Sequence, residues 1–254
     1  MMRFPVSLSA ILLAAAGVVL SGGAHAQSSS SQTPAQAPSQ NPPQSEVQTV
    51  PPGTPGNGTY VVVDPLAGVR YDERWDVSLG AAYGHIKAGP PPLEQGANLG
   101  GLDLSASYWL SKRWAVEGTG RGYLGTSGAG VNDLSIAGPF VSEYVFAGGP
   151  EWLGPHNKHG ALMAHAMVGG AYGYFERDLR GNPPSAVEFF NNQLALAAVI
   201  GGHIDLNRSP RWVFRITPDA KYTRYSINYG NMATYPYWNF AISVGVEYKF
   251  KKKR

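Results

Sequence analysis

Residues 238–250, the last strand-like stretch of the chain, alternate strictly between two kinds of side chain. Every second position is apolar or aromatic, and the positions between are small or polar. The apolar set is Trp238, Phe240, Ile242, Val244, Val246, Tyr248 and Phe250. A period of two predicts a β-strand with one apolar and one polar face. Aromatic residues stand at both ends of the apolar face, which is typical of a strand that faces lipid, because amphipathic rings favour the two interfaces of a bilayer.

Seven stretches upstream show the same alternation, which predicts eight strands in all. We expect the other seven at residues 75–83, 102–110, 114–123, 140–152, 161–174, 193–206 and 212–223. Long connections are expected at residues 87–97, 124–138 and 226–237 and around Pro183, and short turns alternate with them. Short periplasmic turns that alternate with long extracellular loops are typical of an outer-membrane barrel. The predicted fold is all-β: an eight-stranded antiparallel up-and-down transmembrane β-barrel.

Aromatic residues at the predicted strand ends form two levels. Five tryptophans fall at the short-turn side, whereas Trp238 lies on the long-loop side, where many tyrosines gather. Two such levels indicate the aromatic girdles of a membrane barrel. The predicted girdle residues are Trp75, Trp109, Trp114, Trp152, Trp212, Trp238, Tyr248 and Phe250.

The first 70 residues predict export and a linker. Residues 1–26 have a basic start at Arg3, an apolar core and an Ala-His-Ala site before Gln27, as a cleaved signal peptide does. Residues 27–70 are rich in Ser, Gln and Pro and have too few apolar side chains to fold, so we expect a disordered periplasmic linker. The barrel is expected over residues 71–254, in the outer membrane of a Gram-negative cell envelope.

Composition agrees with a membrane barrel and excludes several other classes. Only 15% of the 254 residues are charged, whereas a soluble domain has about 25%. The absence of cysteine excludes disulfides, thiolate metal sites and a lipoprotein anchor. A formal net charge of +3 is too small to indicate nucleic-acid binding.

Three segments resemble the small OmpA/OmpX-type outer-membrane barrels of the porin-like superfamily: residues 108–121, 201–206 and 244–250. The resemblance covers roughly residues 71–250. It implies that outer-membrane lipid surrounds a monomer, and that the barrel assembly machinery reads the C-terminal strand, with Phe250 as its final aromatic. In two respects the sequence departs from that pattern: no peptidoglycan-binding domain follows the barrel, and the basic residues 251–254 extend past the terminal aromatic.

Seven charged residues fall on the inward face of the predicted strands. They are Asp103, Glu117, Arg121, Arg215, Asp219, Lys221 and Glu247. Because side chains fill the lumen of an eight-stranded barrel, these charges need partners inside the protein. Glu117 and Arg121 are four positions apart on one strand, about 13 Å, so we expect each to pair across strands. The prediction is a structural ion-pair network, and the alternative is a path for protons or ions.

A soluble lipocalin-like barrel is the rival fold. Its polar face would point to water and would be rich in Lys, Glu and Thr, whereas many of these positions are Gly, Ala and Ser. The two aromatic girdles would also have no cause in a soluble barrel.

The sequence predicts no catalytic, cofactor-binding or metal-binding residue. No histidine stands in a His-x-Ser arrangement like that of lipid A deacylases, and the glycine-rich residues 125–130 lack the Lys-Ser/Thr of a phosphate loop. His165 and His203 are expected in the lumen as satisfied core residues. His156 and His159 share a turn, but two nitrogens do not make a metal site without further ligands.

Loop composition favours one function class. The long loops are rich in Tyr, Asn, Gly and Pro and show no clustered acid, base and nucleophile. We therefore expect a non-catalytic structural or surface-interaction role through the extracellular loops. The alternative is a narrow transporter or a lipid-modifying outer-membrane enzyme.

Overall fold

The computed structural model describes residues 64–228 and 232–250. The predicted signal peptide, most of the predicted linker and the basic residues 251–254 lie outside the described residues. The described end of the linker, residues 64–70, contains a turn, and the Asp64 carboxylate lies 3.2 Å from Lys158 Nζ. None of the described residues belongs to a helix long and apolar enough to cross a membrane.

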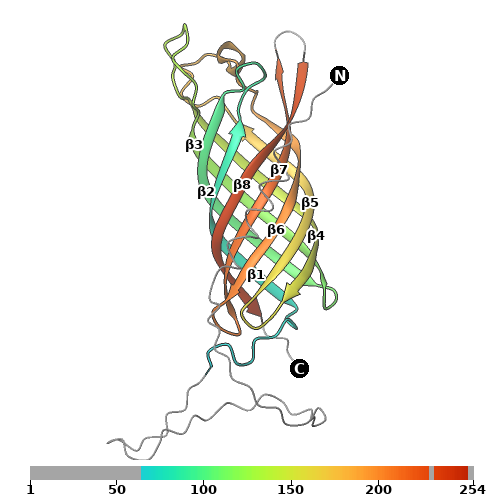
Figure 1. Cartoon of the computed structure of the whole chain (residues 1–254). Coiled ribbons are helices and arrows are strands. Elements are labelled where there is room, and N and C mark those ends of the chain that lie inside the picture. The colour runs from blue at the N-terminus through green and yellow to red at the C-terminus, as the bar shows by residue number, and fades with distance from the viewer. Residues whose placement is uncertain (1–63, 229–231, 251–254) are drawn as a thin grey trace, which may run out of the picture. The chain divides into compact units, whose positions relative to one another are not determined.

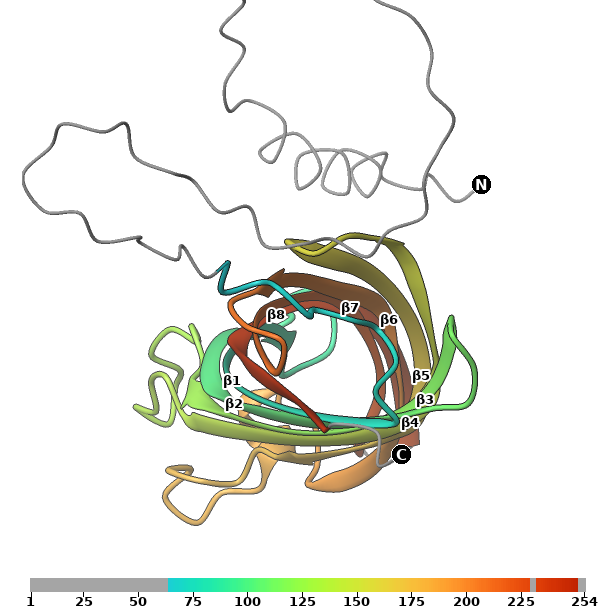
Figure 2. The same cartoon turned by 90° about the horizontal axis from the view of Figure 1, so that it is seen from below.

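Eight antiparallel strands form a closed barrel (Figure 1). They are β1 (Trp75–Lys87), β2 (Gly96–Trp109), β3 (Trp114–Thr126), β4 (Phe140–His156), β5 (Gly160–Tyr174), β6 (Gln193–Asn207), β7 (Trp212–Asn228) and β8 (Met232–Phe250). Each strand pairs with the next in sequence, and β8 pairs with β1 from Trp75↔Phe250 to Gly84↔Ala241. Seen from below, the strands form a ring (Figure 2). The predicted fold class and the predicted closure by the last strand are confirmed.

The apolar face of each strand points outward. Leu102 and Leu104 of β2 and Val244 and Val246 of β8 are exposed on the wall, whereas the alternate position between the two leucines, Asp103, is buried. A soluble barrel would reverse this arrangement, because its apolar side chains would fill the interior. The outward apolar belt therefore fits a barrel surrounded by lipid.

The two ends of the barrel differ. We call the end that carries the turns at residues 110–113, 157–159 and 208–211 the short-turn end. The opposite, long-loop end carries the connections at residues 88–95, 127–139 and 175–192, and the last of these includes the 3-10 helix η1 (Pro184–Val187). The predicted alternation of short turns and long loops is present.

The strands β7 and β8 extend further than the sequence predicted. Residues 226–237 were expected to be a loop, but pairing continues through Tyr225↔Tyr235 to Asn228↔Met232. Figure 1 shows the ends of β7 and β8 running side by side at the long-loop end. Outside the lipid both faces of a hairpin can meet water, so the apolar alternation that marks a lipid-facing strand is lost. This hairpin also contains Pro236, a residue type that is uncommon inside strands. The strand β2 also begins earlier than predicted, at Gly96.

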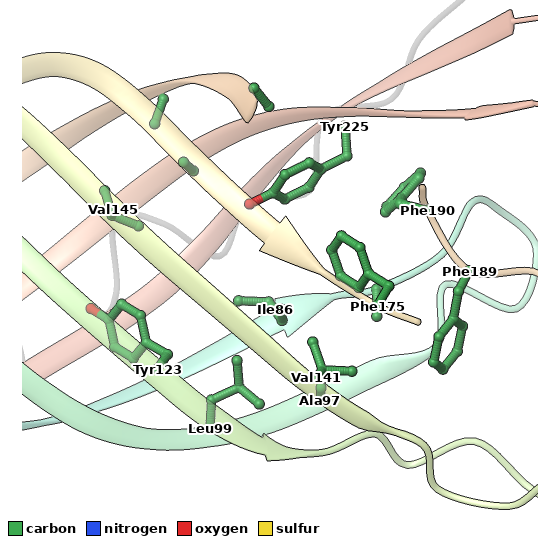
Figure 3. Packing of buried hydrophobic residues seen from close by; sticks show 14 of the residues in the cluster. Ile86, Ala97, Leu99, Tyr123, Val141, Val145, Phe175, Phe189, Phe190 and Tyr225 are labelled. Atoms are coloured by element: carbon green, nitrogen blue, oxygen red, sulfur yellow. The ribbon is translucent and has the colours of Figure 1, made fainter. Parts of the chain in front are cut away.

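A hydrophobic cluster, which we call the plug, closes the lumen at the long-loop end (Figure 3). Strand ends and the β5–β6 connection contribute many of its members. Among them are Ile86, Leu99, Tyr123, Val141, Phe175, Phe189, Phe190, Tyr225 and Ile227, each at most 1% exposed. Phe190 is held in place by its backbone N–H, which donates to the carbonyl of Ala88 at 2.9 Å. The plug gives the barrel a core at the end where the loops emerge.

Candidate functional site

The lumen between the plug and the short-turn end holds the candidate functional residues. The structure places all seven predicted lumen charges there, each at most 6% exposed. They lie on β2, β3, β7 and β8. Six of them belong to three groups of ion pairs stacked along the barrel, and the seventh, Glu117, lies beside two histidines. A fourth group, around two histidines, was not predicted as a site.

Arg215 organises the group nearest the short-turn end. Its guanidinium binds Asp205 through two contacts, Nε to Oδ1 at 2.8 Å and Nη2 to Oδ2 at 2.9 Å. The same side chain lies 2.8 Å from Glu247 Oε2 and 4.0 Å from Asp76 Oδ1. A forked cation between carboxylates of β1, β6 and β8 links strands on both sides of β7.

Arg121 organises the middle group. It forms an ion pair with Asp219 across the lumen, and its Nε lies 3.3 Å from Asp103 Oδ1. Asp103 also accepts hydrogen bonds from Thr119 Oγ1 at 2.9 Å and from Ser243 Oγ at 2.7 Å. The expectation that Arg121 pairs across strands and not with Glu117 agrees with these contacts.

Lys221 organises the group beneath the plug. It forms an ion pair with Glu143, whose other oxygen accepts a hydrogen bond from the Tyr225 hydroxyl at 2.9 Å. The Lys221 ammonium also lies 4.6 Å from the centre of the Tyr123 ring. Both aromatic partners belong to the plug, so this group joins the polar lumen to the hydrophobic core.

The fourth group, which we call the histidine cluster, gathers ligand-type atoms from four consecutive strands. His165 Nδ1 of β5 lies 2.8 Å from Glu117 Oε2 of β3 and 3.2 Å from His203 Nε2 of β6. His203 Nε2 lies 3.3 Å from the same Glu117 oxygen and 3.6 Å from Glu151 Oε1 of β4. All four side chains are at most 1% exposed. Among the described residues, Glu117, His165 and His203 have the proximity of a metal-ligand group.

The outward nitrogens of both imidazoles have polar partners on β7. His165 Nε2 lies 2.8 Å from Asp219 Oδ1, and His203 Nδ1 lies 2.9 Å from Thr217 Oγ1. These partners fix the ring orientations and direct the two remaining nitrogens at Glu117.

Glu143 and Glu151 of β4 are site residues that the sequence analysis missed. Both are fully buried. The alternation around Tyr144 could have placed Glu143 inward, and the same parity carried along β4 reaches Glu151. Two glycines and Pro150 interrupt the pattern between them, which hid the second position.

The predicted girdle residues lie at the strand ends, with one difference. Seven are exposed or partly exposed on the wall, and rings stack in pairs such as Trp212 with Tyr248, whose centroids are 5.0 Å apart. Trp109 instead points inward: its indole N–H donates to Asp76 Oδ2 at 2.6 Å and its ring packs beside Leu153. The period of two places Trp109 on the polar face of β2, where its N–H has a carboxylate to bind.

The other histidine pair remains at the surface. His156 and His159 are both exposed in and beside the β4–β5 turn. His156 Nδ1 lies 2.9 Å from the carbonyl oxygen of Gly154. Neither residue belongs to a group of ligand-type side chains among the residues that the structure describes.

Comparisons with known proteins show which solved structures have a similar fold. No protein-family model matches the chain, and no curated protein matches it in sequence. The outer membrane protein OprG of Pseudomonas aeruginosa aligns with a TM-score of 0.50 at 14% identity, over 70% of this chain and 96% of that one. The chain has the fold of a small outer-membrane β-barrel.

Two further solved structures are similar with lower scores. Ail, the attachment invasion locus protein of Yersinia pestis, aligns with a TM-score of 0.43 at 16% identity, over 70% of this chain and 99% of that one. Outer Membrane Protein W of E. coli aligns with a TM-score of 0.39 at 11% identity, over 70% and 98%. The OprG likeness and the lipid-facing belt support an outer-membrane barrel protein.

Proposed function

We propose that this protein is a non-catalytic outer-membrane barrel with a structural or surface-interaction role, carried by its extracellular loops. The filled lumen is the observation that carries this proposal. The plug covers the long-loop end, and the ion pairs centred on Lys221, Arg121 and Arg215 occupy the levels below it. A lumen filled in this way favours a display scaffold over a pore.

The loops form a connected platform above the plug. Phe190 of the β5–β6 connection binds the backbone of Ala88 in the β1–β2 connection, and Gly128 N–H donates to the Gly96 carbonyl at 2.7 Å. On this platform Leu93 is 61% exposed and Val131 75% exposed. These exposed apolar side chains are available to contact a partner, and they belong to the loop surface that we propose for this role.

A lipid-modifying enzyme would need reactive groups that reach lipid at the outer wall. His165 and His203 instead face the lumen, behind the strands. Their position supports a non-catalytic role for the two buried histidines.

Two measurements, one on the purified protein and one on cells that produce it, test the proposal against the transporter and the enzyme. A planar bilayer with the pure protein should show no stable porin-like steps, and lipid A from cells that overproduce the protein should have an unchanged mass spectrum. Reproducible large steps would support the transporter, and a new lipid A species would support the enzyme.

The double variant Leu93→Asp/Val131→Asp should leave the barrel folded but reduce surface attachment or envelope resistance in a deletion strain. Full complementation by that variant would contradict a role for the loop surface.

A further inference from the structure

The histidine cluster has the spacing of a metal site. The three mutual distances among His165 Nδ1, His203 Nε2 and Glu117 Oε2 are 2.8, 3.2 and 3.3 Å. A tetrahedral zinc ion with ligands about 2.0–2.2 Å away holds them about 3.3 Å apart. The Glu151 oxygen 3.6 Å from His203 Nε2 supplies a fourth donor from the next strand.

The surroundings orient these donors as they do in zinc proteins. Metal-bound imidazoles commonly donate their other N–H to a carboxylate or another oxygen. Asp219 occupies that place for His165 and Thr217 for His203. A glycine at position 201 is required for the first contact, because a Cβ there would lie 1.9 Å from Asp219 Oδ1.

Unpartnered carboxylate oxygens point to a missing cation. Glu117 Oε1 and both oxygens of Glu151 are buried without any hydrogen-bond partner. A buried carboxylate oxygen without a partner destabilises the folded state. The other group of nearby carboxylates (Glu73, Asp76 and Glu247) has cations beside it, since Arg215 and Lys249 lie within ion-pair distance.

The charge balance of the lumen also indicates a missing cation. Among the described residues, the fully or nearly buried charged side chains comprise eight acidic and four basic ones. The acidic set is Asp76, Asp103, Glu117, Glu143, Glu151, Asp205, Asp219 and Glu247, and the basic set is Arg121, Arg215, Lys221 and Lys249. No Lys or Arg of the described residues forms an ion pair with Glu117 or Glu151. A dication between these two carboxylates would therefore offset much of the excess.

We propose that Glu117, Glu151, His165 and His203 bind one divalent transition-metal ion inside the barrel. Two imidazoles and two carboxylates suit Zn²⁺ and related first-row ions, whereas Ca²⁺ and Mg²⁺ take oxygen ligands alone and Cu⁺ takes sulfur. Four protein donors complete the shell, as in structural zinc sites. The ion would tie together β3, β4, β5 and β6 and so stabilise the wall.

Metal content and affinity test the proposal on the full-length protein in detergent. After unfolding with chelator and refolding with Zn²⁺, the wild-type protein should retain one ion per chain by mass spectrometry of the metal. The variants Glu117→Gln and His203→Gln should lose it. The control variant His85→Gln/His156→Gln/His159→Gln removes three exposed histidines and should keep it.

A variant of a positioning residue distinguishes a metal site from a buried hydrogen-bond network. Thr217→Val leaves all four donors in place but removes the partner of His203 Nδ1, so Zn²⁺ affinity should fall about tenfold or more. If the lumen variants do not fold, two measurements on the wild-type protein still test whether it binds a metal ion. Refolding with Co²⁺ should give the visible spectrum of a four-coordinate site, and Zn²⁺ should raise the temperature of unfolding. Zn²⁺-free wild-type protein, or loss of binding only in the surface-histidine control, would overturn the proposal.

Discussion

Trp75 and Phe250 face each other across the seam that joins the first strand to the last. Both rings are about half exposed on the wall at the short-turn end. Phe250 also packs edge-on against Tyr248, with ring centroids 5.0 Å apart. The residue that ends β8 therefore sits at the place where the barrel closes.

We expect Phe250→Ala to lower the amount of assembled barrel in the outer membrane, because it weakens the seam and removes the final aromatic that the resemblance assigns to assembly. Deleting residues 251–254 should have a much smaller effect. Phe240→Ala is a matched control, since Phe240 is on the same strand and similarly exposed at 45%. Heat-shifted bands from isolated outer membranes measure the outcome. Normal assembly of Phe250→Ala with failure of the tail deletion would contradict the prediction.

Resistance to SDS without boiling should follow from closure. All eight strands have two hydrogen-bonded neighbours, so no sheet edge is open to the detergent. The refolded protein should migrate differently on a gel before and after boiling. Identical migration of the two samples would argue against a closed barrel.

The plug should contribute strongly to stability. Phe190→Ala removes a fully buried ring that contacts Phe175 and Tyr225, so we expect a loss of about 3–5 kcal/mol in the free energy of unfolding. Phe146→Ala is the control, because this side chain is 63% exposed on the lipid-facing wall and its loss opens no cavity. The midpoint of the heat shift should fall clearly for the first variant and little for the second. Equal midpoints would show that the plug is not a core.

The Lys221–Glu143 pair should behave as a buried ion pair. Lys221→Met leaves the Glu143 carboxylate without its cation and should cost about 3–5 kcal/mol in urea unfolding. The double variant Lys221→Met/Glu143→Gln should regain most of that loss, because the uncompensated charge is gone. Lys158→Met breaks the exposed pair with Asp64 and should change stability little. A double variant as unstable as Lys221→Met would mean that the charge pairing does not matter.

The sequence by itself determined which side of the wall each residue faces. The pleat of a strand sends successive side chains to opposite faces, so the alternation placed the apolar residues outward and charges such as Arg121 and Asp219 inward without any knowledge of the neighbours. It also located the terminal strand at the seam. In β4 the alternation of apolar and polar residues is not evident, because Gly148, Gly149 and Pro150 interrupt it before Glu151.

Only the tertiary structure decided which inward residues meet. Arg121 and Asp219 are 98 positions apart and lie on strands that face each other across the lumen. The histidine cluster depends on the stagger of each strand pair, such as the register that sets Glu151 opposite His165. Stagger is fixed by closing the whole ring of eight strands. Parity along one strand is a local property, whereas the level of a residue in the lumen depends on every strand pair around the barrel.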